Sequence, residues 1–176
     1  NKKKSDLTKD RFEGNIPASI YNSGKPSTAV TVDGAEFAAH IRSLPKGYLP
    51  TTVFELDLEG TLYSAIVKEI QYHPTTYQVR HLDFQLLEDK TPIFIKIPVV
   101  FAGSGDCVGV KLGGFIRQIL HHVKVRCLPA DMPKEFTLDI RNLEIGQSKR
   151  IRDIETGDKV RTVINEKEIV VVIAKR

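Results

Sequence analysis

The stretch TVFELDLEGTLYSAIVKEIQYHPTTYQVRHLDF, residues 52–84, contains the alternation of apolar and polar side chains that is typical of β-strands. Within Thr52–Leu58 every second residue is apolar, with Phe54, Leu56 and Leu58 expected to face inward. Glu59 and Gly60 then offer a two-residue hairpin turn to a returning strand over Leu62–Gln71. A break at HPTT separates this hairpin from a third strand, Tyr77–Phe84. We therefore expect three consecutive antiparallel strands in the first half of the chain.

The third of these strands raises a question about function, because its two faces differ in kind. Leu82 and Phe84 form an apolar face that suits a buried core. A period of two places the opposite face on Tyr77, Val79, His81 and Asp83. An imidazole and a carboxylate two positions apart should therefore project together from the side of the sheet that faces away from the core.

The remainder of the first half predicts a sheet with one helix. In DGAEFAAHIRSL, residues 33–44, Asp33 and Glu36 form a capping box ahead of apolar residues at helical spacing. Pro17 in GNIPASIY cannot donate a backbone hydrogen bond and so indicates an edge strand. One helix among about five antiparallel strands suggests a small β-barrel-like domain or a sheet with one helix.

From Ile93 onward the strand pattern begins again, which predicts a second domain. Strands are expected over Ile93–Phe101, Glu135–Ile140 and the closing segment EIVVVIAK, with at most short helices between them. The Gly-rich segment AGSGDCVGVKLGG has neither Rossmann nor Walker spacing, so its glycines are interpreted as turn residues. The expected fold class is thus mainly β with few helices, divided into domains at residues 1–92 and 93–176.

Composition and charge narrow the class of protein. The formal net charge of +4 divides into −1 for residues 1–92 and +5 for residues 93–176, a weak indication of an acidic partner. Cys107 and Cys127 lack the spacing of a zinc site and are interpreted as reduced core residues of a cytoplasmic protein. No apolar run reaches the roughly 18 residues that a membrane span needs. Because the first residue is Asn1 rather than Met, we expect the natural chain to begin earlier.

Five histidines invite a catalytic or metal-binding interpretation, which their placement mostly disfavours. His40 lies among apolar residues of the expected helix, while the neighbouring His121 and His122 would face opposite sides of a strand. No HExxH, DxD or P-loop motif is present. We therefore expect no enzyme, no cofactor and no bound metal. The rival hypothesis is a metal-dependent hydrolase that uses His73, His81 and Asp83.

Nucleic acid offers a physical reason for a carboxylate beside an imidazole. A carboxylate repels phosphate, so it is costly on an RNA-binding surface unless it accepts hydrogen bonds from a base edge. The N1–H and N2–H₂ groups of guanine present two such donors in parallel, and a histidine can donate to a phosphate or a 2′-hydroxyl. Asp83 beside His81 could then read a base. The two could equally form a surface pair that satisfies itself, and spacing alone does not decide.

Several blocks of sequence, in a fixed order, carry a resemblance to a known family. They are RFEGNIPASIYNSG, VKEIQYHPTTYQVRHLDFQ, IPVVFAG, VGVKLGG, VKVRCLPADMP and LEIG. From about Lys4 to its C-terminus, the chain resembles the bacterial ribosomal proteins that bind 5S ribosomal RNA, in the longer two-domain form called general stress protein CTC. The resemblance implies a structural protein of the large ribosomal subunit. Its first domain would be a β-barrel-like 5S-binding unit in the central protuberance, followed by a β-rich domain.

The resemblance also implies which residues contact RNA. The implied set is Lys4, Lys9, Arg11, Tyr21, Lys68, Gln71, His81 and Asp83. In this set Arg11 would grip phosphates, while Tyr21 would pack on a ribose or bond a phosphate. His81 and Asp83 would contact the RNA directly, with Asp83 reading a base.

Two positions depart from the family pattern. Asn22 stands where the family usually has glycine, although asparagine tolerates a left-handed backbone better than most residues. Thr8 stands where many relatives have arginine, which predicts weaker phosphate anchoring. His73 and Pro74 are interpreted as residues that shape a turn rather than contact RNA.

The implied partners are 5S ribosomal RNA, the large subunit and its neighbouring proteins, with no membrane, and the protein would be a monomer off the ribosome. An alternative within RNA biology is an RNA-binding stress factor that acts away from the ribosome. The net charge of +5 in the second domain suits either neighbouring RNA or a protein partner, and the sequence does not choose between them.

Overall fold

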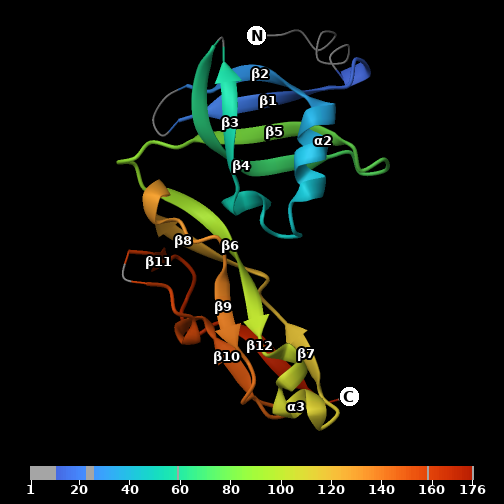
Figure 1. Cartoon of the computed structure of the whole chain (residues 1–176), viewed down its shortest axis with the longest axis vertical. Helices are drawn as coiled ribbons and strands as arrows, with labels where there is room; N and C mark the ends of the chain where they lie inside the picture. Colours follow the sequence, from blue (N-terminus) through green and yellow to red (C-terminus); the bar gives the residue numbers. More distant parts are fainter. Residues whose placement is uncertain (1–10, 23–25, 59, 158, 176) are drawn as a thin grey trace. The chain divides into compact units, whose positions relative to one another are not determined.

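The computed structural model describes residues 11–22, 26–58, 60–157 and 159–175. The chain divides into two compact units, Asn1–Thr91 and Pro92–Arg176. Both units consist mainly of β-strands joined by short helices and loops (Figure 1), so the mainly β fold class predicted from the sequence is confirmed. No helix in the described ranges is long and apolar enough to cross a membrane.

The first unit is built on one five-stranded sheet in the order β2-β1-β5-β4-β3. The strands are β1 (Asn15–Tyr21), β2 (Thr28–Asp33), β3 (Val53–Leu58), β4 (Thr61–Tyr72) and β5 (Val79–Leu86). The predicted hairpin of β3 and β4 and the antiparallel return of β5 are present. The expectation of a wholly antiparallel sheet is wrong at one place, because β5 runs parallel to β1 along its other side.

The prediction that Pro17 marks an edge strand is also wrong. Strand β1 lies inside the sheet, with β2 on one side and β5 on the other. Pro17 is nevertheless tolerated, because its antiparallel partner is Thr31 on β2 and the pairing with β5 begins only at Ala18. At the proline itself β1 therefore has a strand neighbour on one side only, as an edge position would.

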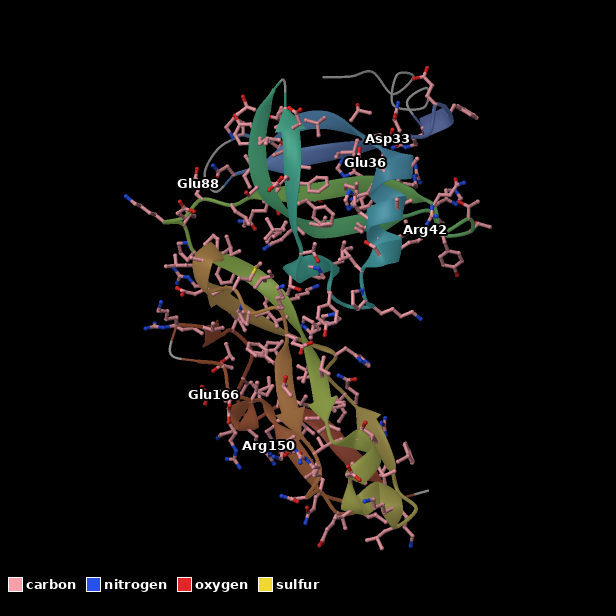
Figure 2. The ribbon with its side chains drawn as sticks, viewed as in Figure 1. Asp33, Glu36, Arg42, Glu88, Arg150 and Glu166 are labelled. Carbon is pink, nitrogen blue, oxygen red and sulfur yellow. The ribbon has the colours of Figure 1, made fainter. Side chains whose placement is uncertain are left out.

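The helix α2 (Gly34–Ser43) follows β2 directly and covers the apolar face of the sheet. Asp33 caps its first turn as predicted, since Asp33 Oδ1 accepts hydrogen bonds from the backbone N–H groups of Ala35 and Glu36 at 2.7 and 3.1 Å. Among the hydrogen bonds of the described residues, the reciprocal bond to the Glu36 side chain that would complete the predicted capping box is absent. Figure 2 shows Asp33 at the start of the helix, with Glu36 and Arg42 further along it. Gly34 is required here, because a Cβ at this position would overlap the carbonyl oxygen of Gly14.

The core of the first unit lies between this helix and the sheet. Its buried members come from β1, α2, β4 and β5, and are Ile16, Ala18, Ile20, Phe37, Ala65, Val67, Leu82 and Phe84. The rings of Phe37, Phe54 and Phe84 pack with centroids 6.1 to 6.4 Å apart. Each buried side chain of this size contributes about 1.5–3 kcal/mol relative to exposure. The predicted inward positions on β3 and β5 are thus confirmed.

The second unit contains two small sheets, ordered β11-β8-β6-β9 and β10-β12-β7. The strands are β6 (Ile93–Ala102), β7 (Phe115–Gln118), β8 (His122–Cys127), β9 (Phe136–Asp139), β10 (Ser148–Arg150), β11 (Arg161–Thr162) and β12 (Ile169–Ala174). The helices between strands are short, as predicted, and the α-helix among them is α3 (Val108–Lys111). Both cysteines are free and buried, which agrees with their interpretation as reduced core residues.

The Gly-rich segment of the second unit has two structural roles, of which the sequence predicted one. Gly103 and Gly113 have φ angles of 72° and 91° and so act as turn residues. Gly109 instead lies in α3 and is buried against β12. A Cβ on Gly109 would lie 2.7 Å from Ile173 Cγ2 and 2.9 Å from the carbonyl oxygen of Leu143. This glycine is therefore needed for close packing rather than for a turn.

Candidate nucleic-acid interface

The face of the first sheet that is turned away from the core carries a row of polar side chains from three adjacent strands. We call this surface the polar face and define it by Ser19, Tyr21, Glu69, Gln71, His81 and Asp83. Strand register brings its members together, because Asp83 pairs with Ser19 on β1 and with Glu69 on β4. Gln71 pairs with His81 in the same way. The structure thus brings Tyr21, Gln71, His81 and Asp83 onto one surface.

A β-bulge in β4 is what places two of these residues on the polar face. Val67 pairs with Phe84 and Glu69 pairs with Asp83, so Lys68 is an extra residue without a partner in the register. Simple alternation from the buried Val67 would have sent Glu69 into the core. With the bulge, Glu69 and Gln71 are exposed and Ile70 packs against the core instead.

A second irregularity corrects the expected face of β5. Gln71 pairs with His81 but Tyr72 pairs with Val79, so Arg80 is the extra residue on this strand. As a consequence Val79 packs against the core, and the prediction that it shares a face with His81 is wrong. Tyr77 lies before β5 in a left-handed conformation with φ 55°, and is not part of the strand. The pair formed by His81 and Asp83 faces outward as predicted.

The imidazole of His81 lies between two partners of the polar face. Its Nε2 atom is 3.2 Å from Ser19 Oγ, and its Nδ1 atom is 3.1 Å from Asp83 Oδ1. The second contact has the distance of an ion pair but not the alignment of a hydrogen bond, so within the described residues Nδ1 is buried without a hydrogen-bond partner. The side chains of His81 and Asp83 remain 27% and 28% exposed. Both groups are therefore oriented by the sheet and accessible to a ligand.

The carboxylates of Asp83 and Glu69 lie close enough to Tyr21 to act on the pKa of its phenol. Burial raises the pKa of the Tyr21 phenol, and the carboxylates of Asp83 and Glu69 raise it further because they oppose a negative phenolate. The Tyr21 phenol therefore ionises less readily than an ordinary tyrosine, and its hydroxyl can donate a hydrogen bond. Two carboxylates, a phenol and an amide on one open surface suit hydrogen bonding to base edges and 2′-hydroxyls better than binding to phosphate alone.

Cationic residues lie beside the polar face rather than within it. The Arg11 guanidinium donates to the backbone oxygen of Arg80 at 3.4 Å, which places Arg11 at the start of β5. Lys68 and Arg80, the two bulge residues, are both exposed. Lys4 and Lys9, the other basic residues expected to contact RNA, lie outside the described residues. Arg11, Lys68 and Arg80 thus place positive charge beside the polar face, where it would attract phosphates.

His73 has the structural role that the sequence predicted. Its Nδ1 atom accepts hydrogen bonds from the backbone N–H groups of Thr75 and Thr76, each at 3.3 Å, and its backbone bonds to Gln78 and Tyr77 close the turn. Across the described residues, no three His, Cys, Asp or Glu side chains gather closely enough to hold a metal ion. The set of His73, His81 and Asp83 that a hydrolase would use is therefore not assembled.

Sequence reasoning missed three residues at this site. Ser19 could have been found, because it alternates with the buried Ala18 and Ile20 in the same strand. Glu69 and Arg80 could not, because their positions follow from bulges that a period of two does not reveal.

Comparison with known protein families matches both units. Residues 1–84 match the Ribosomal L25p family, and residues 92–176 match the C-terminal domain of ribosomal protein TL5. The large ribosomal subunit protein bL25 of Chlamydia pneumoniae is 40% identical to this chain over 174 residues, which cover 99% of the chain and 94% of the relative. The bL25 proteins of Chlamydia trachomatis serovar A and Chlamydia abortus are 41% identical over the same shares.

These relatives are structural ribosomal proteins rather than enzymes. They support neither the hydrolase nor the stress factor acting away from the ribosome, which the sequence had left open. Identity at this level over nearly the whole length, together with a family match to each unit, leads to one conclusion. The chain belongs to the L25p family of large ribosomal subunit proteins, in a two-domain form that carries the TL5 C-terminal domain.

Proposed function

We propose that this protein is a structural component of the large ribosomal subunit and that it binds 5S ribosomal RNA through the polar face of its first unit. The first unit would serve as the RNA-binding domain and the second as a separate β-rich domain. The observation that carries the proposal is Asp83, an outward carboxylate held beside His81 and Gln71 on the sheet.

The contact between Asp83 and His81 leaves the carboxylate able to bind RNA. Because the approach of Nδ1 to Oδ1 lacks hydrogen-bond alignment, it does not use up the acceptor capacity of Asp83. A carboxylate can accept two parallel hydrogen bonds, as the N1–H and N2–H₂ groups of guanine would supply.

The other residues divide between orientation and anchoring. Gln71, opposite His81, offers both a donor and an acceptor to a base edge or a ribose. Tyr21 offers a protonated hydroxyl and a ring that can pack on a ribose. Arg11 and Lys68 supply positive charge beside the polar face, and phosphate contacts of this kind add affinity without sequence preference.

The proposal is tested by measuring the affinity of the full chain for 5S ribosomal RNA with Asp83→Ala. We expect binding to weaken by about 1–3 kcal/mol, the size of one lost base contact. Glu55→Ala is the matched control, because Glu55 is an exposed carboxylate on β3 at the far edge of the same sheet. It should leave the affinity unchanged or slightly raised.

Unfolding curves of both variants must be recorded alongside the titrations, so that loss of fold is not mistaken for loss of contact. If a folded Asp83→Ala protein bound 5S ribosomal RNA as tightly as the wild type, base recognition by Asp83 would be wrong. If wild-type protein showed no preference for 5S ribosomal RNA over unrelated RNA of equal length, the proposed function itself would be wrong.

A further inference from the structure

The outer surface of the four-stranded sheet in the second unit combines cations with an exposed aromatic ring. We call this surface the basic patch and define it by Phe94, Lys96, Lys124, Arg126 and Arg161. The register of β6, β8 and β11 places them side by side, since Phe94 pairs with Arg126, Lys96 with Lys124, and Arg161 with Arg126. The alternate residues of β6 and β8 are buried, so the basic patch is the face turned away from the core.

Phe94 is unusual for its position on this surface. Its ring is 46% exposed, although burial of a phenylalanine is strongly favourable. Lys124 Nζ lies 5.6 Å and Arg126 Cζ lies 5.9 Å from the ring centroid, so two cations stand against the ring. An aromatic ring kept at the surface among positive charges offers a flat π-surface and phosphate ligands in one place.

Among the described residues, the cations of the basic patch form no ion pair with a carboxylate. The ion pairs described in the second unit involve other cations, namely Lys111, Arg141, Arg152 and Lys159. Within the described residues, Lys96, Lys124, Arg126 and Arg161 have no carboxylate partner. Their positive charge is therefore available to an external anion, and an uncompensated group of this kind attracts polyanions.

A small pocket adjoins the basic patch at one end. It has a volume of about 270 Å³ and is lined by Pro92, Arg126, Cys127, Leu128, Lys159 and Arg161. Arg126 and Arg161 thus belong to both the pocket and the patch. Lys159 is held in place by Asp131 at 2.9 Å, which leaves the two arginines to dominate the charge of the pocket. A phosphate group fits the charge of such a pocket.

We propose that the basic patch is a second RNA-binding surface, which takes an unpaired stretch of RNA. A base would stack on Phe94, and the flanking phosphates would contact Lys96, Lys124 and the arginine-lined pocket. Single-stranded nucleic acid is favoured over a membrane or an acidic protein, because an exposed aromatic ring among cations offers a stacking surface for a base beside ligands for the flanking phosphates. This surface lies wholly in the second unit and does not depend on the polar face.

The test uses the full chain and a fluorescently labelled oligouridine of about 12 nucleotides, a length within the range that such surfaces cover. Affinity is measured over a series of salt concentrations for the wild type and for three changes. Lys124→Gln with Arg126→Gln removes two phosphate ligands, Phe94→Ala removes the stacking surface, and Phe94→Tyr keeps it. Arg117→Gln with Lys175→Gln is the matched control, because it removes two exposed charges from the other sheet region.

We expect the double change at Lys124 and Arg126 to weaken binding about tenfold or more and to flatten its salt dependence by about 1.4 in the logarithmic slope. Phe94→Ala should weaken binding about tenfold with an unchanged slope, whereas Phe94→Tyr and the control pair should stay close to the wild type. All altered side chains are exposed, and circular dichroism checks that the variants fold.

Three results would overturn the proposal. The first is an equal loss of affinity in the control pair, which would mean that binding follows total charge. The second is unchanged affinity in Phe94→Ala, which would show that no base stacks on this ring. The third is tight binding of vesicles containing phosphatidylserine, lost in Phe94→Ala, with no binding of oligouridine. Asp83→Ala should leave oligouridine binding unchanged, so failure of this proposal is distinguishable from failure of 5S recognition.

Discussion

The polar face of the first unit and the basic patch of the second present opposite chemistry on similar scaffolds. Both are the outward side of a small sheet whose other side is buried. The polar face contains the carboxylates of Asp83 and Glu69, with cations only beside it. The basic patch contains four cations around Phe94 and no carboxylate among its members. Directional hydrogen bonding is therefore the mode that suits the first surface, while charge and stacking suit the second.

The two surfaces also differ in how the backbone builds them. The basic patch follows from regular pairing of β6 with β8, in which every second residue faces outward. The polar face depends on bulges at Lys68 and Arg80, which turn Glu69 outward and Val79 inward. Bulges are frequently placed where a side chain must be re-aimed. The sheet that contains the bulges is thus the one whose proposed hydrogen bonds to RNA need exact placement of side chains.

The largest effect that would separate the two surfaces is expected from Leu82→Ala. Leu82 is fully buried in the core beneath the polar face, so its truncation leaves a cavity. The free energy of unfolding of the first unit should fall by about 2–5 kcal/mol. Denaturant titration should show this, with 5S ribosomal RNA binding lost at lower denaturant. Oligouridine binding should persist, because no residue of the basic patch belongs to this core. If 5S ribosomal RNA binding and oligouridine binding were lost at the same denaturant concentration, the two surfaces would not be independent.

A smaller effect is expected from Arg11→Ala, which probes charge at the border of the polar face. Its guanidinium lies at the start of β5 and would contact phosphate. Binding should weaken severalfold for all RNAs alike, and the logarithmic salt slope should fall by about 0.7–0.9. Arg42→Ala on the exposed side of α2 is the control (Figure 2) and should change neither quantity. A loss confined to 5S ribosomal RNA would instead assign base recognition to Arg11.

The smallest effect concerns Tyr21 and the carboxylates near it. The pKa of Tyr21 is raised above the ordinary 10.0, by burial first and then by Asp83 and Glu69. The folded state therefore holds this proton more tightly than the unfolded state. The resulting stabilisation is complete below about pH 10 and is lost as the pH rises through the folded pKa.

Asp83→Asn should accordingly lower the pKa of Tyr21 without restoring it fully, because burial remains the larger cause. Ultraviolet titration of the phenolate measures this, with Tyr21→Phe identifying which transition belongs to Tyr21. An identical titration in Asp83→Asn and wild type would show that the carboxylate does not act on the phenol, and would contradict the geometry of the polar face.

Much of the fold follows from alternation and capping. The hairpin of β3 and β4, the burial of Leu82 and Phe84, and the cap at Asp33 were all predictable, because each depends on side chains close together in sequence. The outward projection of His81 and Asp83 was predictable for the same reason.

What could not be predicted depends on pairing between distant segments. Strand β5 returns beside β1 and runs parallel to it, which places β1 inside the sheet. Pro17 therefore does not mark an edge strand, although its missing N–H suggested one. Gly109 appeared to be a turn residue because its role depends on Ile173, far away in sequence. The contact of Ser19 with His81 likewise joins residues 62 positions apart.

The most direct test of base recognition is the sign of the change in affinity for 5S ribosomal RNA caused by Asp83→Asn. This substitution keeps the size of the side chain but removes one negative charge from a surface that faces a polyanion. If Asp83 reads a base, affinity should fall by about 1–3 kcal/mol and the loss should be similar at low and high salt. If affinity rises, most strongly at low salt, Asp83 merely repels phosphate and the account of the polar face is contradicted.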